Sequence, residues 1–141
     1  MYSHKEYIRP RYEETDQMGV IYHGNYITWF EQARSGFFRA LGYSYKRLED
    51  EGFWIPVIEV GCKYFAPAKY DEEVYVKTSI DEHKGVRIRL KYQVYDVETE
   101  TLLVEGFTAH ATTDKNLRPV SLKKKTPELY NLIMKCMEDD Q

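Results

Sequence analysis

The sequence of 141 residues predicts an α+β fold in which an antiparallel sheet of five strands wraps around one long helix. Three observations support this prediction. Apolar residues recur at helical spacing over residues 25–41, apolar and polar residues alternate in several stretches after residue 55, and short turns join those stretches. Short turns are typical of antiparallel hairpins. The helix has a broad aromatic face to bury, and the sheet is the only large apolar surface that can cover it.

The N-terminal part of the chain is expected to form one strand and then the long helix. The strand covers residues 5–13, where Pro10 indicates an edge position or a bulge. The helix covers residues 25–41, and Gly42 is well placed to cap its C-terminus. The apolar face of this helix consists of Tyr26, Trp29, Phe30, Ala33, Phe37, Ala40 and Leu41.

Two smaller features follow from the same helical pattern. Gly36 lies inside the long helix, where glycine costs about 1 kcal/mol relative to alanine, so we expect a strand or another helix to approach closely there. A short second helix is expected over residues 45–51, with Ser44 as its N-cap.

The rest of the chain is expected to form four strands and a closing helix. The strands are predicted at residues 57–65, 74–80, 86–97 and 102–113, with turns at residues 84–85 and 98–100. A C-terminal helix is predicted over residues 126–139, with Thr126 as N-cap and Pro127 at its first position. We expect one domain over residues 1–141.

Composition excludes several classes of protein. Hydrophobic residues make up 43% and aromatic residues 15% of the chain, which argues against disorder. The net charge of −3 gives no general attraction to nucleic acid or to an anionic membrane. No secretory h-region or membrane-spanning apolar run is present, and Cys62 and Cys136 form no CxxC motif. A cytoplasmic protein with two free thiols, without nucleic-acid binding or membrane insertion, is expected.

The connection that precedes the long helix is the part of the chain that suggests chemistry. It contains Asp16 and His23, and it leads directly into the start of the helix. A helix N-terminus offers unpaired backbone N–H groups and a partial positive charge, which together stabilise an anion. Both residues also have structural interpretations, because an aspartate often stabilises a turn and a histidine at a helix start often bonds backbone or packs at a subunit contact. The four histidines show no metal-ligand spacing, and no GxSxG motif is present.

The same connection resembles a known family. Its pattern is Thr15-Asp16-x-x-Gly19-Val20-x-Tyr22-His23-x-Asn25-Tyr26, followed by Phe30-Glu31-x-Ala33-Arg34. This pattern is similar to the signature of hotdog-fold acyl-CoA thioesterases, in particular the 4-hydroxybenzoyl-CoA thioesterase and YbgC-like branch. A second match is Tyr64-x-x-Pro67-Ala68-x-Tyr70-Asp71. Glu14 departs from the family pattern, which often has aspartate at this position.

The resemblance implies a hotdog fold and hydrolysis of an acyl-CoA thioester to a free acid and CoA, without a metal or a bound cofactor. It assigns Asp16 as the catalytic general base or nucleophile. It also implies that the backbone N–H of His23 polarises the thioester carbonyl, while a role of the imidazole in proton transfer stays open. The residues that it places around the acyl group are Tyr22, Asn25 and Tyr26.

The resemblance further implies a homodimer or homotetramer in which the pantetheine arm passes between subunits. Glu31 is the reserve catalytic residue, although its spacing from Arg34 favours a structural ion pair on the helix surface. Two alternative functions stay open: a hotdog dehydratase or hydratase, and a non-catalytic binder of acyl thioesters. The acyl group and the thiol carrier, CoA or acyl carrier protein, also stay open.

Overall fold

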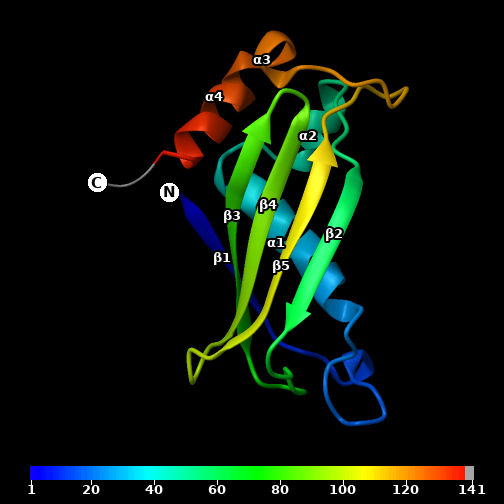
Figure 1. Cartoon of the computed structure of the whole chain (residues 1–141), viewed down its shortest axis with the longest axis vertical. Helices are drawn as coiled ribbons and strands as arrows, with labels where there is room; N and C mark the ends of the chain where they lie inside the picture. Colours follow the sequence, from blue (N-terminus) through cyan, green and yellow to red (C-terminus); the bar gives the residue numbers. More distant parts are fainter. Residues whose placement is uncertain (139–141) are drawn as a thin grey trace.

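A computed structural model describes residues 1–138 and contains one antiparallel sheet of five strands in the order β1-β3-β4-β5-β2 (Figure 1). Helix α1 (Asn25–Ala40) crosses one face of this sheet (Figure 1). The α+β architecture predicted from the sequence, a five-stranded sheet around one long helix, is therefore confirmed. The strands are β1 (Ser3–Ile8), β2 (Val57–Tyr64), β3 (Val74–Lys84), β4 (Arg87–Asp96) and β5 (Leu102–Ala111).

The shorter helical elements lie at the two ends of the sheet (Figure 1). Helices α2 (Tyr45–Asp50), α3 (Leu122–Lys125) and α4 (Pro127–Cys136) lie together at one end. The 3-10 turn η1 (Tyr12–Glu14) and the loop before α1 lie at the opposite end. No helix in the described part of the chain is both long and apolar enough to cross a membrane.

The predicted first strand, residues 5–13, is wrong in its boundaries. β1 begins at Ser3 and ends at Ile8, and it pairs with β3 along its whole length. Pro10 has no N–H to donate to a ladder, and the chain then tightens into η1 instead of continuing as a strand. β1 does lie at an edge of the sheet, as Pro10 indicated.

The other strands follow the predicted pattern with one clear difference. β3 continues to Lys84, beyond its predicted end at residue 80. A register shift between Ile80 and Glu82 lets its pairing with β4 continue as far as the pair Lys84 and Arg87. This shift breaks the alternation of apolar and polar residues, which is why the sequence pattern predicted the end of β3 too early.

The C-terminal region contains two helices where one was predicted over residues 126–139. α3 and α4 are separated at Thr126, because Pro127 cannot donate the backbone hydrogen bond that would continue α3. Pro127 occupies the start of α4 as expected, but the Thr126 side chain makes no capping bond. Its hydroxyl lies 2.9 Å from that of Tyr43. The predicted end of the helix, residue 139, lies outside the described residues.

The aromatic face of α1 is buried against the sheet. Tyr26, Trp29, Phe30, Ala33 and Phe37 are each at most 2% exposed. The Phe30 ring is stacked on that of Tyr92 in β4, with ring centroids 4.4 Å apart. The predicted face was too long at its C-terminal end, where Ala40 is exposed and Leu41 is only partly buried.

Two glycines of this region have different structural reasons, close approach at Gly36 and backbone conformation at Gly42. A side chain at Gly36 would meet the His4 and Glu6 side chains of β1, which confirms that a strand approaches the helix there. Gly42 follows the helix with φ of +82°, a conformation that favours glycine at a C-cap. The predicted cap of α2 is also confirmed, because the Ser44 hydroxyl accepts a 3.2 Å bond from the N–H of Arg47.

We predict that Gly106→Ala destabilises the fold. Gly106 lies in β5 beneath α1, and an added Cβ would lie 2.6 Å from the Phe30 ring and 2.8 Å from the Gly61 carbonyl oxygen. Because the second contact is to backbone, side-chain rotation cannot relieve it. The free energy of unfolding, measured by urea denaturation, should fall by about 1–3 kcal/mol. The neighbouring change Glu105→Ala should alter it by less than about 0.5 kcal/mol, and equal effects would contradict this account.

Candidate active site

A tight loop holds Asp16 close to the start of α1. The backbone N–H of Asp16 bonds the Val20 carbonyl at 2.8 Å, and the N–H of Gly19 bonds the Asp16 carbonyl at 3.1 Å. The N–H of Tyr22 then bonds the Glu14 carbonyl at 2.9 Å. These bonds fold the residues between Glu14 and Tyr22 back on themselves, so that Asp16 and the helix start face the same region.

Glu14 anchors this loop to α1. Its carboxylate is buried, and it accepts a 2.9 Å bond from the indole N–H of Trp29 and a 2.8 Å bond from the backbone N–H of Arg11. The Glu14 carbonyl also accepts a 2.8 Å bond from the side-chain amide of Asn25. Sequence reasoning treated Glu14 only as a departure from the family pattern and missed this role. The buried indole of Trp29, which needs an acceptor, was the signal that could have found it.

Asp16 and His23 line one cavity of about 300 Å³ beside the N-terminus of α1. Both sequence motifs contribute to this cavity. The first motif supplies the loop before α1, and the second supplies the end of β2 and the chain after it. The wall residues are Asp16, Met18, Val20, Ile21, His23, Tyr26, Tyr64, Phe65, Ala66 and Pro67.

Asp16 has both a structural contact and a free oxygen. Its Oδ1 accepts a 2.8 Å bond from the backbone N–H of Met18, which is the turn-stabilising role considered from the sequence. Oδ2 has no hydrogen-bond partner among residues 1–138. The turn thus fixes the direction of the carboxylate and leaves one oxygen available at the cavity.

The backbone around His23 offers a hydrogen-bond donor. Gly24 is the N-cap of α1, and the N–H of Asn25 is already bonded to the Tyr22 carbonyl at 2.9 Å. The N–H of His23 has no hydrogen-bond partner within the described chain. Because it lies at a helix N-terminus, this N–H is suited to an oxygen that carries or develops negative charge.

The remaining predicted site residues fall into two groups. Tyr26 is buried in the cavity wall, where its hydroxyl accepts a 3.0 Å bond from the N–H of Ala68. Tyr22 and Asn25 are outside that wall. The exposed Tyr22 ring lies 4.3 Å from the His23 ring, measured between centroids, and Asn25 holds the Glu14 carbonyl. The structure therefore brings Asp16, His23 and Tyr26 together and gives Tyr22 and Asn25 supporting positions.

Tyr64 is a wall residue that sequence reasoning did not assign to the site. Its hydroxyl donates a 3.1 Å bond to the His23 carbonyl, so β2 holds the residue that precedes the N-cap. Desolvation raises the pKa of Tyr64 to about 12, which keeps this donor protonated at neutral pH. Its place in the second sequence motif was the available signal.

Glu31 and Arg34 do not form the ion pair that their spacing suggested. Glu31 is exposed and lines a separate polar groove on α1, away from the Asp16 cavity. Arg34 points inward, where it donates to the hydroxyls of Tyr45 at 2.5 Å and Tyr92 at 3.2 Å. Within residues 1–138, no group of three or more His, Cys, Asp or Glu side chains is placed to hold a metal ion.

Proteins similar to this chain include several described as thioesterases. Escherichia coli YbgC, described as an acyl-CoA thioester hydrolase, is 30% identical over 118 residues, which cover 83% of this chain and 87% of YbgC. Bacillus subtilis YneP, described provisionally as an acyl-CoA thioesterase, is 32% identical over 137 residues, covering 96% of this chain and 99% of YneP.

Structure and family comparison agree with this similarity. A solved DHNA-CoA thioesterase from Staphylococcus aureus superposes with a TM-score of 0.90 at 35% identity, covering 96% of this chain and 91% of that one. The expected hotdog fold is thereby confirmed. The family described as the thioesterase-like superfamily matches residues 10–131. The chain therefore belongs to the thioesterase-like superfamily.

Proposed function

We propose that this protein hydrolyses an acyl-CoA thioester to a free acid and CoA, with Asp16 as the catalytic carboxylate. One observation carries the proposal: Asp16 and His23, whose backbone N–H is unbonded, line the same cavity at the start of α1. Thioester hydrolysis needs a base or nucleophile and a donor for the carbonyl oxygen. The thioesterase descriptions of YbgC and YneP support the reaction class.

In the proposed reaction, the thioester carbonyl oxygen accepts a hydrogen bond from the N–H of His23. The partial positive charge of the helix N-terminus stabilises the negative charge that develops on this oxygen. The free Oδ2 of Asp16 then acts in one of two ways. As a nucleophile it attacks the carbonyl carbon and forms an anhydride that water hydrolyses, and as a general base it takes a proton from the attacking water. In both cases the CoA thiolate leaves and is protonated.

The other site residues serve this geometry in the proposed mechanism. Tyr26 forms part of the wall that receives the acyl group. Tyr22 covers the His23 ring, and Asn25 keeps the loop in place through the Glu14 carbonyl. The imidazole of His23 is exposed beside the cavity, which leaves a proton-transfer role open to test. The proposed unit is one domain acting in the cytoplasm, in line with the two unpaired cysteines, Cys62 and Cys136.

We also propose a homodimer in which two β2 strands pair antiparallel. β2 is an edge strand, and its outer side carries no strand in the described chain. Val57, Ile58 and Val60 are 47%, 50% and 40% exposed, although all three are apolar. An exposed apolar edge is a template for another strand, and pairing with a second copy satisfies its backbone and covers these side chains. A homotetramer built from two such dimers remains compatible with this edge.

The reaction is tested by release of free thiol from a panel of aromatic, short, medium and long acyl-CoAs. We expect saturable release from at least one of them. A parallel panel on acyl carrier protein identifies the preferred carrier. If every acyl-CoA in the panel binds and is recovered intact, the protein is a binder of acyl thioesters. If the protein instead hydrates or forms a double bond in the acyl chain, it is a dehydratase or hydratase.

We predict that Asp16→Asn lowers turnover by about 100-fold or more while the fold and oligomer persist. Asparagine keeps the acceptor for the Met18 N–H but loses the charge. His23→Ala should lower turnover only modestly, because alanine retains the backbone N–H. A loss as deep as that of Asp16→Asn would instead assign the imidazole to proton transfer. Near wild-type turnover in Asp16→Asn would make Glu31 the next residue to replace.

We predict that the protein sediments as at least a dimer at micromolar concentration and that Val60→Lys weakens it. Val60 lies near the middle of β2, so two copies of the lysine would face each other across the strand pair. Sedimentation velocity should show a shift toward monomer. The control Tyr7→Lys, at a large hydrophobic residue that is 54% exposed on the opposite edge strand β1, should leave the mass unchanged. A monomeric wild-type protein would refute the proposed assembly.

A further inference from the structure

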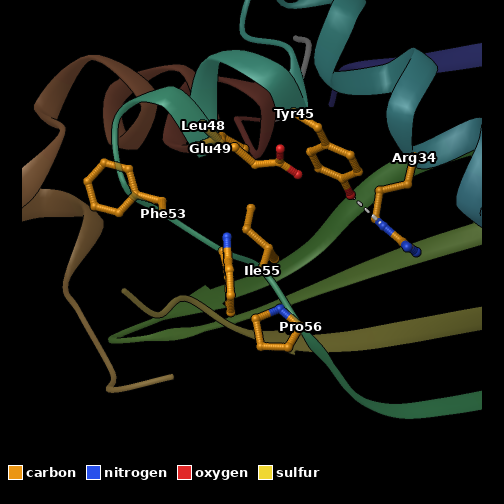
Figure 2. A pocket seen from close by; sticks show the side chains of 8 residues that line it. Arg34, Tyr45, Leu48, Glu49, Phe53, Ile55 and Pro56 are labelled. Atoms are coloured by element: carbon orange, nitrogen blue, oxygen red, sulfur yellow. Dashed lines mark hydrogen bonds between the residues drawn. The ribbon is translucent and has the colours of Figure 1, made fainter. Parts of the chain in front are cut away.

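A second cavity, of about 320 Å³, lies where β2 starts, at the opposite end of that strand from the Asp16 site. It is bordered by α2, by the segment that leads into β2, and by Arg34 of α1 (Figure 2). Its walls are mainly apolar, and Figure 2 shows the Arg34 guanidinium hydrogen-bonded to the Tyr45 hydroxyl. The apolar wall residues are Leu48, Phe53, Trp54, Ile55 and Pro56.

The Arg34 side chain is a buried positive charge without a negative partner. The residue is only 7% exposed, yet no carboxylate among residues 1–138 forms an ion pair with it. Its two recorded hydrogen bonds go to the hydroxyls of Tyr45 and Tyr92. Burial raises the pKa of both tyrosines, so both hydroxyls stay neutral. A buried charge without compensation is costly, and such a charge at a cavity favours an anionic ligand.

A chain of neutral groups fixes the orientation of this guanidinium. The Tyr92 hydroxyl lies 2.7 Å from that of Thr108, which lies 2.7 Å from Nε2 of His110. Burial and the nearby Arg34 charge lower the pKa of His110 to about 4, so its ring is neutral at physiological pH. These contacts use two of the five N–H donors of the guanidinium, and the other three have no hydrogen-bond partner among residues 1–138.

The proposed dimer brings this cavity to the active site. Both cavities lie on the α1 side of the sheet, one against Ile55 and Pro56 at the start of β2, the other against Tyr64 and Phe65 at its end. In Figure 1, β2 runs from the end of the sheet near α2 to the end near the loop before α1. Antiparallel pairing of two β2 strands sets the start of one strand beside the end of the other. The Arg34 cavity of one subunit is then adjacent to the Asp16 cavity of the other.

We propose that the Arg34 cavity binds a carboxylate at the far end of the acyl group, so that the preferred substrates are mono-CoA thioesters of dicarboxylic acids. This inference rests on the proposed thioesterase function and dimer. Arginine binds carboxylates through two parallel hydrogen bonds, and apolar walls strengthen that attraction and accept the methylene chain. Glu49 is the acidic residue of the lining, but its side chain is exposed to solvent, which screens its repulsion.

The first test compares kcat/KM of the wild-type protein for pairs matched in carbon number. The pairs are glutaryl- and pentanoyl-CoA, adipoyl- and hexanoyl-CoA, and suberoyl- and octanoyl-CoA. We expect the diacid thioester to be preferred by about tenfold or more in at least one pair, which corresponds to about 1.4 kcal/mol. Hydrolysis of the monoacid members at equal or greater efficiency in every pair would overturn the inference.

The second test assigns the preference to Arg34. Arg34→Met keeps a long side chain and removes the charge, and it should reduce the diacid-to-monoacid ratio to about one. Arg34→Lys keeps the charge without the fork and should give an intermediate ratio. The matched control is Arg39→Met, on the same helix but exposed, which should leave the ratio and the basal activity unchanged. A ratio unaltered in a folded Arg34→Met protein, checked by circular dichroism, would also refute the inference.

Binding of free acids separates failure of this inference from failure of the proposed function. Titration calorimetry should show that adipate binds the wild-type protein at least tenfold more tightly than hexan-1-ol, which has the same chain length and no carboxylate. If no thioester is hydrolysed but adipate is still preferred, the carboxylate site stands and the thioesterase proposal fails. If thioesters are hydrolysed without diacid preference and adipate does not bind, the thioesterase proposal stands and the carboxylate site fails. Both results use the wild-type protein and so do not depend on the folding of a variant.

Discussion

Burial of the aromatic face of α1 is the constraint on which the rest of this structure depends. Phe30 of α1 stacks on Tyr92 of β4. The next strand, β5, has a glycine at position 106, because any side chain there would collide with the Phe30 ring and with the neighbouring backbone. The helix and the sheet therefore lie very close together at this point. The buried residues of the sheet are concentrated on β3, β4 and β5, whereas the edge strand β2 keeps apolar residues exposed. The packing that stabilises one protomer thus also leaves the edge through which we propose that it pairs.

The geometry of the proposed active site depends on a contact of the same helix. Trp29 lies on the buried face of α1, and its indole N–H must find an acceptor once it leaves water. The Glu14 carboxylate supplies that acceptor and draws the whole loop onto the helix start. Asp16 is then oriented by its bond to the Met18 N–H, and the N–H of His23 stays unbonded. Core packing and site organisation are therefore one arrangement, and loss of the Glu14 contact would disturb both.

Helix α1 also connects the two cavities of the protomer. Its N-terminus borders the Asp16 cavity, and Arg34, slightly more than two turns after the buried Tyr26 of that cavity, borders the second one from the same helix. Polar groups on the buried side of the sheet, from Tyr92 to His110, hold the guanidinium without neutralising it. A buried charge in such a network is costly unless an anionic ligand compensates it. We therefore propose that substrate specificity depends on the cavity beside Arg34 and not on the helix surface.

The sequence by itself determined the fold class and most element positions, because apolar periodicity and turn residues are local signals, and its motif indicated Asp16 and His23 as candidate site residues. The helix from Asn25, the glycine that follows it at position 42 and the N-cap at Ser44 all depend on such local chemistry. Tertiary structure alone decided which polar side chains are turned inward. Spacing predicted a surface ion pair for Arg34, but the tyrosine hydroxyls that receive it come from α2 and β4, which are distant in sequence. The anchoring role of Glu14 was missed for a related reason: the sequence indicates that a buried Trp29 indole needs an acceptor, but only folding brings the Glu14 carboxylate to it.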